Sequence, residues 1–401
     1  MKYIFIGDRT LLNKYVSLFP EINGYIISFI ECSKSELQSN IAKYNDIDTQ
    51  FIIVFDICNE IGKIPVNSQY IFDFLSDKIV NSELMPRKVR IEASTLCQLD
   101  CKGCYMRLHD YGLVGKGYLH YLDFKSFIDK HPYVREIELS NSGEIFLNPD
   151  LVRIMEYAFK HNVRLTAING VNFNNVSQEQ LEALVKYDFR YLMISIDGAS
   201  NDSYKKYRRN GCYENVIHNI ELLQALKDKY GRQYPKIVWQ FIIMPESEDD
   251  VILAKQEAQR LNIPIWFKLT WDENYIPKKP ALLARETGLK EFNRHDFLIN
   301  NRKVYIGAET CSQMFLAPQI NWDGRLLGCC ELFTSDYGVN VFEIGLSNAL
   351  KIELFIQAKK MLLGIKNDYS LYDIPCKRCY KYKQRILVNE VLYPFRSLLS
   401  D

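Results

Sequence analysis

The sequence carries almost no net charge and no long apolar run. Its 50 lysine and arginine residues balance 49 aspartate and glutamate residues, which leaves a formal charge of +1. Such a balanced charge provides no overall electrostatic field that would attract nucleic acid or an anionic membrane. No apolar stretch reaches the roughly 18 residues that a membrane-spanning helix needs. We therefore predict a cytoplasmic protein with no nucleic-acid partner and no membrane partner.

Histidine-based metal motifs and glycine-rich phosphate loops are also missing. None of the six histidines falls in a metal-ligand spacing. A single glycine, Gly7, follows the first predicted strand, whereas a dinucleotide fingerprint needs a glycine-rich turn. Cysteine, by contrast, is abundant, with 11 residues. In a reducing cytosol these favour metal binding or catalysis over disulfides, although Cys32 and Cys58 lie in apolar surroundings typical of inert buried thiols.

The 401 residues are enough for two or three domains. Residues 1–82 alternate predicted strands and helices and indicate a small α/β, Rossmann-like domain. Residues 86–275 contain six such alternations, which predict a partial (β/α)6 barrel of the TIM type. Residues 301–385 form a third unit that contains cysteines. The predicted fold class is therefore α/β.

Three cysteines directly follow the first strand of the predicted barrel. Cys97, Cys101 and Cys104 have the order C-x3-C-x2-C. Three thiolates can hold three corners of a four-iron cluster, which leaves the fourth iron open to another ligand. In parallel α/β folds ligands bind at the carboxyl ends of the strands, where this loop falls. A zinc knuckle or three buried thiols are the alternatives.

This segment resembles the signature of the radical S-adenosylmethionine (radical SAM) enzymes. The resemblance implies a [4Fe-4S] cluster whose open iron binds SAM, and an electron donor such as flavodoxin or ferredoxin. In that family an electron from the cluster splits SAM into methionine and a 5′-deoxyadenosyl radical. Many members place an aromatic residue before the third cysteine, against the adenine. Here that residue is Gly103, and Tyr105, after Cys104, is the candidate for this contact.

The ends of later strands carry more of the same resemblance. The turn Ser142-Gly143-Glu144 resembles the family's turn that holds the SAM amino group, and a carboxylate suits an ammonium partner. Arg208 is expected to pair with the SAM carboxylate, because a guanidinium makes a bidentate contact that lysine does not; a solvated helix end is the alternative. The resemblance adds four further cofactor contacts: Asn169, Ser195, Asp197 and Gln240.

A second cysteine group has the pattern C-x12-G-x4-C followed by C-x2-C. Its members are Cys311, Gly324, Cys329, Cys376 and Cys379. The pattern resembles the twitch domain, the short form of the SPASM domain, and its ligand spacing resembles that of 2-deoxy-scyllo-inosamine dehydrogenases. The resemblance implies one auxiliary [4Fe-4S] cluster bound by all four thiolates. Two separated cysteine pairs also suit tetrahedral zinc.

The residues beside Cys329 are candidates for the chemistry of the substrate. In sulfatase-maturating enzymes, which this region resembles, an acidic residue follows the comparable cysteine. Here that position holds Cys330, whose thiol could give a hydrogen atom to a substrate radical or could simply be a small buried side chain. Glu331 and Asp323 are the nearest carboxylates that could accept a proton.

Together these patterns predict a radical SAM iron–sulfur oxidoreductase. It would abstract hydrogen from an unactivated C–H bond of a small polar metabolite, namely a sugar, an aminocyclitol or a nucleotide-sugar, with the auxiliary cluster as electron acceptor. One alternative is a peptide-modifying enzyme, or an epimerase that uses Cys330 as hydrogen donor. Peptide modifiers often carry a winged-helix-like recognition domain, which the strand–helix pattern of residues 1–82 does not resemble. A non-catalytic metal scaffold is the other alternative.

Overall fold

The structure is a computed structural model, and it describes residues 2–43, 50–55, 68–270, 272, 274–300 and 308–387. Cys58 lies outside these residues. Cys32 is half-buried and packs against a small apolar cluster of the N-terminal sheet, so it is less enclosed than the sequence suggested. Across the described residues, every helix is too short or too polar to span a membrane.

The N-terminal residues form a parallel four-stranded sheet with the strand order β2-β1-β3-β4. Helix α1 begins after Asp8, whose carboxylate accepts a hydrogen bond from the Leu11 amide at 3.0 Å and so caps the helix. The elements are β1 (Tyr3–Gly7), α1 (Arg9–Leu18), the 3-10 helix η1 (Pro20–Tyr25), β2 (Ile26–Glu31), α2 (Leu37–Ala42), β3 (Phe51–Val54), β4 (Ser68–Tyr70) and α3 (Ile71–Val80).

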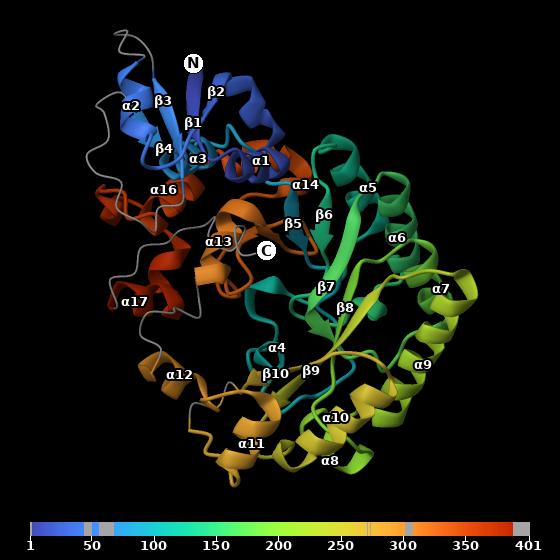
Figure 1. The fold of residues 1–401 in the computed structure, drawn as a ribbon. Helices are drawn as coiled ribbons and strands as arrows, with labels where there is room; N and C mark the ends of the chain where they lie inside the picture. The colour runs from blue at the N-terminus through green and yellow to red at the C-terminus, as the bar shows by residue number, and fades with distance from the viewer. Residues whose placement is uncertain are drawn as a thin grey trace.

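Six parallel strands form the partial barrel, in the order β10-β9-β8-β7-β6-β5. They are β5 (Lys88–Ile91), β6 (Glu136–Glu138), β7 (Arg164–Val171), β8 (Tyr191–Ser195), β9 (Lys236–Ile243) and β10 (Ile265–Leu269). Five helices cover the outer face of these strands (Figure 1): α5 (Tyr121–Lys130), α6 (Leu151–Lys160), α7 (Gln178–Lys186), α9 (Tyr213–Tyr230) and α10 (Val251–Arg260). Short helical segments occupy the loops: α4 (Tyr105–Leu108), η2 (Gly112–Val114), η3 (Ile145–Leu147), α8 (Asn201–Tyr207) and η4 (Glu248–Asp250).

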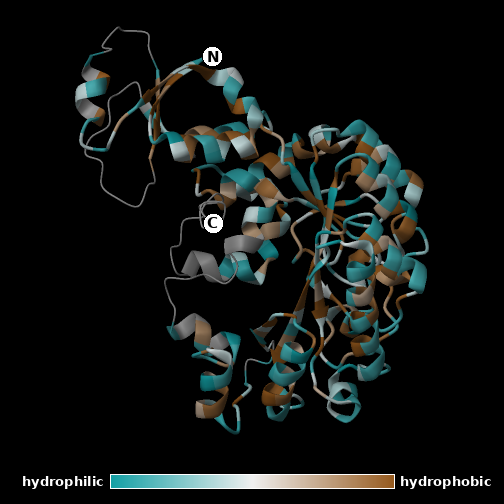
Figure 2. Ribbon diagram, turned by 45° about the vertical axis from the view of Figure 1, so that its right-hand side comes forward, coloured by the Kyte–Doolittle hydropathy of each residue, from teal (hydrophilic) through white to brown (hydrophobic). Residues whose placement is uncertain are grey.

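The barrel strands present an apolar side to the helices and a polar side to the interior. On β5 and just beyond it, Val89 and Ile91 belong to the main apolar core, whereas the alternate residues Arg90 and Glu92 are buried and ionisable. Successive side chains of a strand point to opposite faces, so these two side chains face the interior. Figure 2 shows the hydrophobic strands enclosed by helices whose outer surfaces are hydrophilic. The predicted α/β fold class and partial barrel are confirmed.

The C-terminal part extends the barrel sheet. Strand β11 (Gln319–Ile320) pairs in parallel with β5 and antiparallel with β12 (Leu326–Gly328). Gly324 lies in the turn between them with a φ of +90°, and a Cβ there would come within 2.2 Å of Asn340 Oδ1, so the turn requires glycine. The other elements are α11 (Pro280–Thr287), α12 (Arg294–Asn300), α13 (Ala308–Leu316), α14 (Val341–Ile344), α15 (Leu346–Leu350), α16 (Glu353–Leu362), η5 (Tyr369–Leu371), η6 (Pro375–Arg378) and α17 (Tyr380–Leu387).

A buried lysine joins the C-terminal part to the N-terminal sheet. Lys359 of α16 donates to the Ile79 carbonyl of α3 at 2.8 Å and to Ser82 Oγ at 3.2 Å. Ser82 Oγ donates in turn to the Leu350 carbonyl at 3.0 Å. Figure 1 shows α16 beside α3. These contacts hold α3 of the N-terminal unit against α16.

The buried position of Lys359 gives a prediction about stability and pH. Burial lowers the pKa of its ammonium to about 7, whereas an unfolded lysine has a pKa of about 10.4. Between these values the unfolded chain binds a proton that the folded chain lacks. The free energy of unfolding therefore rises with pH through this window, by at most about 1.4 kcal/mol per pH unit from this group.

We expect Lys359→Met to lose this rise. The native protein should gain stability relative to the variant as the pH increases from about 7 to about 10 in urea unfolding under anaerobic conditions. Lys366→Met, at an exposed position, serves as the control and should follow the native curve. If the native and Lys359→Met proteins show parallel curves, Lys359 is not buried as a neutral amine.

Candidate active site

The loop after β5 places three cysteines at the carboxyl end of the barrel. Cys97, Cys101 and Cys104 are all half-buried. The Cys104 amide donates to the Cys101 carbonyl at 3.1 Å, and Asn172 Nδ2 lies 3.6 Å from Cys97 Sγ. Burial raises the pKa of Cys97 to about 12 and also raises that of Cys101. Free thiols here stay protonated at neutral pH, and metal binding displaces such protons.

The backbone of this loop is bonded to the segment at the end of α8. The Asp100 amide donates to the Arg209 carbonyl at 3.0 Å, and the Lys102 amide donates to the Tyr207 carbonyl at 3.3 Å. The ammonium of Lys102 also pairs with Glu246 at 2.9 Å. The end of α8 therefore fixes where the cysteine loop lies.

Arg208 and Asp197, both predicted as cofactor contacts, bind each other. Arg208 Nε lies 2.7 Å and Arg208 Nη2 lies 2.6 Å from Asp197 Oδ2. The other oxygen of this fully buried carboxylate accepts from the Ile242 amide at 2.8 Å. The guanidinium lies close enough to Cys101 to oppose the rise in the pKa of that thiol. The structure thus places Arg208 beside the cysteine loop, with its charge balanced by Asp197.

The turn Ser142-Gly143-Glu144 packs directly against the same loop. A Cβ on Gly143 would lie 2.2 Å from the Ser94 carbonyl oxygen, so only glycine permits this approach. Glu144 is buried, and its carboxylate accepts from the Asn172 amide at 2.6 Å. Burial raises the pKa of Glu144 to about 7, and the carboxylate in turn raises the pKa of Cys97. A buried carboxylate beside the thiols provides the partner that an ammonium group needs.

Ser195 and Gln240 form one hydrogen-bonded row along the adjacent strands β8 and β9, which ends in a lysine of β10. Gln240 Nε2 donates to Ser195 Oγ at 3.0 Å, and Lys268 Nζ donates to Gln240 Oε1 at 3.1 Å. Asn169 lies apart from this row. It is exposed, and its side-chain amide donates to Asn141 Oδ1 at 2.6 Å.

Three residues of this region were not identified from the sequence. Glu92 accepts from the Ser142 amide at 2.9 Å, while its other oxygen is buried with no hydrogen bond to any described residue. Lys268 closes the row across the interior. Tyr207 approaches the cysteine loop, since a Cβ on Gly103 would lie 3.2 Å from its hydroxyl. The sequence gives a signal for Glu92 alone, because Arg90 and Glu92 alternate with apolar residues along β5 and just beyond it.

Tyr105, the predicted aromatic contact, lies on α4 at the edge of the site. It is 39% exposed, and its ring centroid lies 4.1 Å from that of His109 and 4.8 Å from that of Phe333. Tyr207, not Tyr105, is thus the aromatic side chain that lies over Gly103.

The sequence of the barrel matches one family model. Residues 91–252, which include the cysteine loop and the turn at Glu144, match the model of the radical SAM superfamily. These residues form a radical SAM domain. The match supports an enzyme of this superfamily, and the family implies a [4Fe-4S] cluster and SAM. Three thiols, a buried carboxylate and a glycine with no room for a side chain fit both groups.

Solved structures of SuiB share the fold. SuiB of Streptococcus suis bound to S-adenosylmethionine aligns with a TM-score of 0.53 at 14% identity, over 81% of this chain and 80% of that chain. SuiB bound to its precursor peptide SuiA aligns with a TM-score of 0.51 at 14% identity, over 92% and 88%. BtrN in complex with AdoMet and 2-DOIA reaches 0.41 at 12% identity, over 74% and 93%. No curated protein sequence matches the chain.

Three cysteines of the second group, Cys311, Cys329 and Cys376, lie around a buried tyrosine. The Tyr337 hydroxyl lies 3.4 Å from Cys376 Sγ, and the thiols of Cys329 and Cys311 are also close enough to raise its pKa. The Cys379 amide donates to the Cys376 carbonyl at 3.0 Å. Elements α13, β12 and η6 therefore bring these cysteines to one region, and thiols are donors for both iron–sulfur clusters and zinc.

Neither cysteine group is arranged around a single point. Among the described residues, no three His, Cys, Asp or Glu side chains converge as the ligands of one metal ion would. A four-iron cluster has a different requirement, because each thiolate binds its own iron atom.

The three predicted catalytic residues have different surroundings. The Cys330 amide donates to Gln313 Oε1 at 2.9 Å, and the thiol lies near Arg90, at the barrel interior. Glu331 pairs with Lys381. Asp323 lies in the β11–β12 turn instead, where its carboxylate pairs with Arg325 at 2.8 Å and accepts from Asn321 Nδ2 at 2.9 Å. Cys330 is thus beside the interior, and the Asp323 carboxylate is engaged within its turn.

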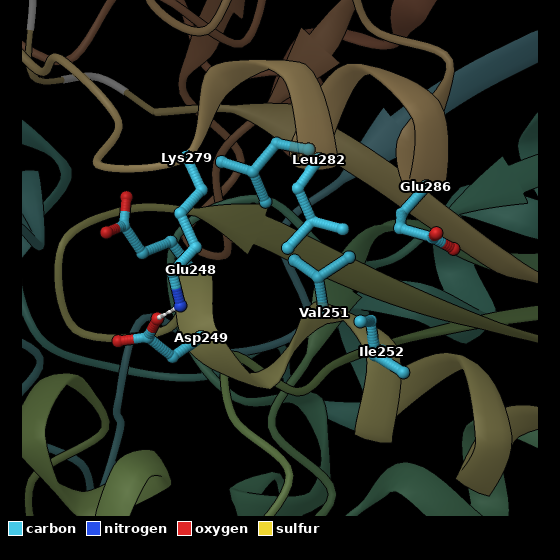
Figure 3. Close-up of a pocket in the computed structure, with 8 residues that line it drawn as sticks. Glu248, Asp249, Val251, Ile252, Lys279, Leu282 and Glu286 are labelled. Carbon is cyan, nitrogen blue, oxygen red and sulfur yellow. Dashed lines mark hydrogen bonds and ion pairs between the residues drawn. The ribbon is translucent and has the colours of Figure 1, made fainter.

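A small pocket between α10 and α11 contains none of these residues (Figure 3). Its walls are apolar side chains flanked by the ion pair of Lys279 and Asp249, 3.4 Å apart. The chemistry of the site therefore belongs to the barrel interior and not to this surface pocket.

Gly143 provides a test of the SAM site. We expect Gly143→Ala to weaken SAM binding at least about tenfold and to destabilise the protein by about 1–3 kcal/mol, because its Cβ overlaps the Ser94 carbonyl. Gly24→Ala is the matched control, since a Cβ there meets no atom within 4 Å. Isothermal titration of SAM into the reconstituted protein measures both variants. Unchanged binding by Gly143→Ala would place SAM elsewhere.

Proposed function

We propose that this protein is an iron–sulfur oxidoreductase that removes hydrogen from an unactivated C–H bond of a small polar metabolite. The main support for the proposal is one cluster of side chains at the carboxyl end of a polar barrel, namely Cys97, Cys101 and Cys104 with Glu144. When bound, the cluster and SAM supply the 5′-deoxyadenosyl radical that the family uses. The residues of this chain would bind and orient the reactants and keep water away.

Each part of the site has a separate task in this proposal. Cys97, Cys101 and Cys104 would hold the SAM-binding cluster and leave one iron open. Glu144 would accept hydrogen bonds from the amino group of SAM. Ser195 and Gln240 lie side by side on the adjacent strands β8 and β9 and would bind hydroxyl groups of SAM or substrate. The Arg208–Asp197 pair would keep the cysteine loop in register.

The C-terminal cysteines would provide the electron acceptor. Cys311, Cys329, Cys376 and Cys379 would hold an auxiliary [4Fe-4S] cluster of the twitch type with no open coordination site. Removal of a hydrogen atom would leave a substrate radical, and the auxiliary cluster, when bound, would supply the acceptor for one further electron. Release of a proton to a base would then complete a two-electron oxidation. Glu331, next to Cys330, is the proposed proton acceptor.

Peptide modification is the second candidate function. The likeness to SuiB bound to the peptide SuiA covers 92% of this chain, which supports a peptide substrate at the level of the fold. The N-terminal sheet is parallel with intervening helices, in contrast to the winged-helix-like domains expected of peptide modifiers. We therefore favour the small metabolite. If Cys330 gave a hydrogen atom to the substrate radical, the reaction of either substrate, metabolite or peptide, would be an epimerisation.

Iron content and SAM cleavage test the proposal together. The anaerobically reconstituted protein should hold about eight iron atoms and form 5′-deoxyadenosine after reduction. Replacing Cys97, Cys101 and Cys104 by alanine should leave about four irons and abolish SAM cleavage, because the other cluster remains. Replacing Cys376 and Cys379 should also lower the iron content to about four but retain SAM cleavage. Zinc in place of iron, or no cleavage under strong reductant, would favour a non-catalytic scaffold.

A further inference from the structure

One tyrosine hydroxyl is buried against sulfur atoms in the C-terminal part. The Tyr337 side chain is only 2% exposed and belongs to the main apolar core. Its hydroxyl lies 3.4 Å from Cys376 Sγ and 3.9 Å from Met314 Sδ, both within the range of hydrogen bonds to sulfur. Among the described residues, the hydrogen-bond partners of this hydroxyl are therefore sulfur atoms.

The packing around the Tyr337 ring fixes the direction of its hydroxyl. The ring centroid lies 4.8 Å from that of Phe355, and the two ring planes meet at 78°. The Tyr337 amide donates to the Leu326 carbonyl of β12 at 3.0 Å. A Cβ on Gly328 would lie 2.9 Å from Cε2 of the ring, so β12 passes directly against it. The hydroxyl is thus held toward Cys376.

The segments that carry two further cysteines meet at the same ring. Gly328, which packs against the ring, directly precedes Cys329, and its Cβ would lie 2.5 Å from Met314 Sδ. Met314 follows Cys311 by three residues on α13, so these two side chains lie on one face of the helix. The hydroxyl that contacts Cys376 therefore lies where the segments of Cys311 and Cys329 approach each other.

This hydroxyl is better matched to a thiolate than to a thiol. The sulfur of a neutral thiol or a thioether is a weak acceptor. Burying a hydroxyl without a good acceptor costs roughly 1–3 kcal/mol, and a phenylalanine would fill the same space without that cost. A metal-bound thiolate carries negative charge, and hydrogen bonds to charged acceptors are about twice as strong as neutral ones. The phenol of Tyr337 is protonated at neutral pH and can donate such a bond.

We propose that Tyr337 donates a hydrogen bond to the Cys376 thiolate and so raises the reduction potential of the auxiliary cluster. This inference rests on the proposed function, in which the C-terminal cysteines hold that cluster. Reduction adds negative charge to the cluster and its sulfur ligands, so the bond stabilises the reduced form more than the oxidised form. A higher potential favours transfer of an electron from the substrate radical to the cluster. Tyr337 acts through Cys376 and is a positioning residue.

The midpoint potential of the auxiliary cluster tests the inference. This cluster is isolated in full-length protein whose first cysteine group is replaced by alanine, at Cys97, Cys101 and Cys104. The protein is reconstituted with iron and sulfide and titrated anaerobically, with detection by electron paramagnetic resonance. In this background, Tyr337→Phe keeps the ring and removes the hydrogen bond. It should lower the equilibrium constant for cluster reduction about tenfold, a downward shift of about 59 mV for one electron.

A control and a second variant separate the hydrogen bond from packing. Tyr275 is 3% exposed, and its hydroxyl donates to Glu248 at 2.6 Å in the region between β10 and α11. Tyr275→Phe therefore also removes a buried hydroxyl but should leave the potential as in the parent protein. Replacing Tyr337 by 3-fluorotyrosine keeps the hydroxyl and makes it a stronger donor, so the potential should rise.

The results distinguish this inference from the proposed function. Unchanged potentials in both Tyr337 variants, with about four irons bound, would overturn the inference and leave the auxiliary cluster in place. An equal downward shift in Tyr275→Phe would also overturn it. If Tyr337→Phe holds no iron, the direction of the shift with 3-fluorotyrosine decides. Absence of iron from the C-terminal cysteines would reject the auxiliary cluster and this inference together, whereas formation of 5′-deoxyadenosine by the native protein tests the radical chemistry separately.

Discussion

The buried ion pair between Arg208 and Asp197 fixes the geometry on which the site depends. Asp197 follows the end of β8 and is fully buried, and the Arg208 side chain is only 13% exposed. Removing one partner of such a pair leaves an uncompensated charge at a cost of about 3–5 kcal/mol. Because the carbonyls of the two residues that flank Arg208 accept bonds from the cysteine loop, the pair also locates the thiols. One interaction thus couples the fourth strand of the barrel to the loop that follows the first.

Two buried carboxylates of the barrel interior differ in how many of their hydrogen-bonding positions are occupied. Glu138 accepts hydrogen bonds from the Ser140 hydroxyl at 2.6 Å, the Thr166 hydroxyl at 2.6 Å and the Ile168 amide at 2.9 Å, so it holds the neighbouring strands β6 and β7 in register. Glu92 has one oxygen bound by the Ser142 amide and the other without a hydrogen bond to described residues. A satisfied carboxylate is structural, whereas one with unmet capacity is suited to interact with a ligand.

The sequence identified the parts of the site that depend on spacing along the chain. The C-x3-C-x2-C loop and the Gly143-Glu144 turn have local constraints, so residue types at fixed offsets revealed them. Lys268 and Tyr207 could not be identified in this way, because their roles depend on which strand face or helix end meets another element. Arg208 illustrates the limit: its type and place were recognised, but its observed partner, Asp197, became evident only from the fold. The parallel barrel followed from strand–helix alternation, whereas the pairing of β11 with β5 involves strands too short to predict.

The short β11–β12 hairpin explains why the two cysteines at positions 329 and 330 face different surroundings. Pairing of β11 with β5 brings the end of β12 to the edge of the barrel. Cys329 there lies among Cys311 and Cys376, whereas Cys330 lies near Arg90 and Lys268. The two residues follow β12 in a bend and a turn, where the chain changes direction, so one segment serves two regions. If the C-terminal cysteines hold a cluster, the path from substrate to electron acceptor crosses a single peptide unit. Changes to this hairpin would therefore alter electron acceptance and substrate contact together.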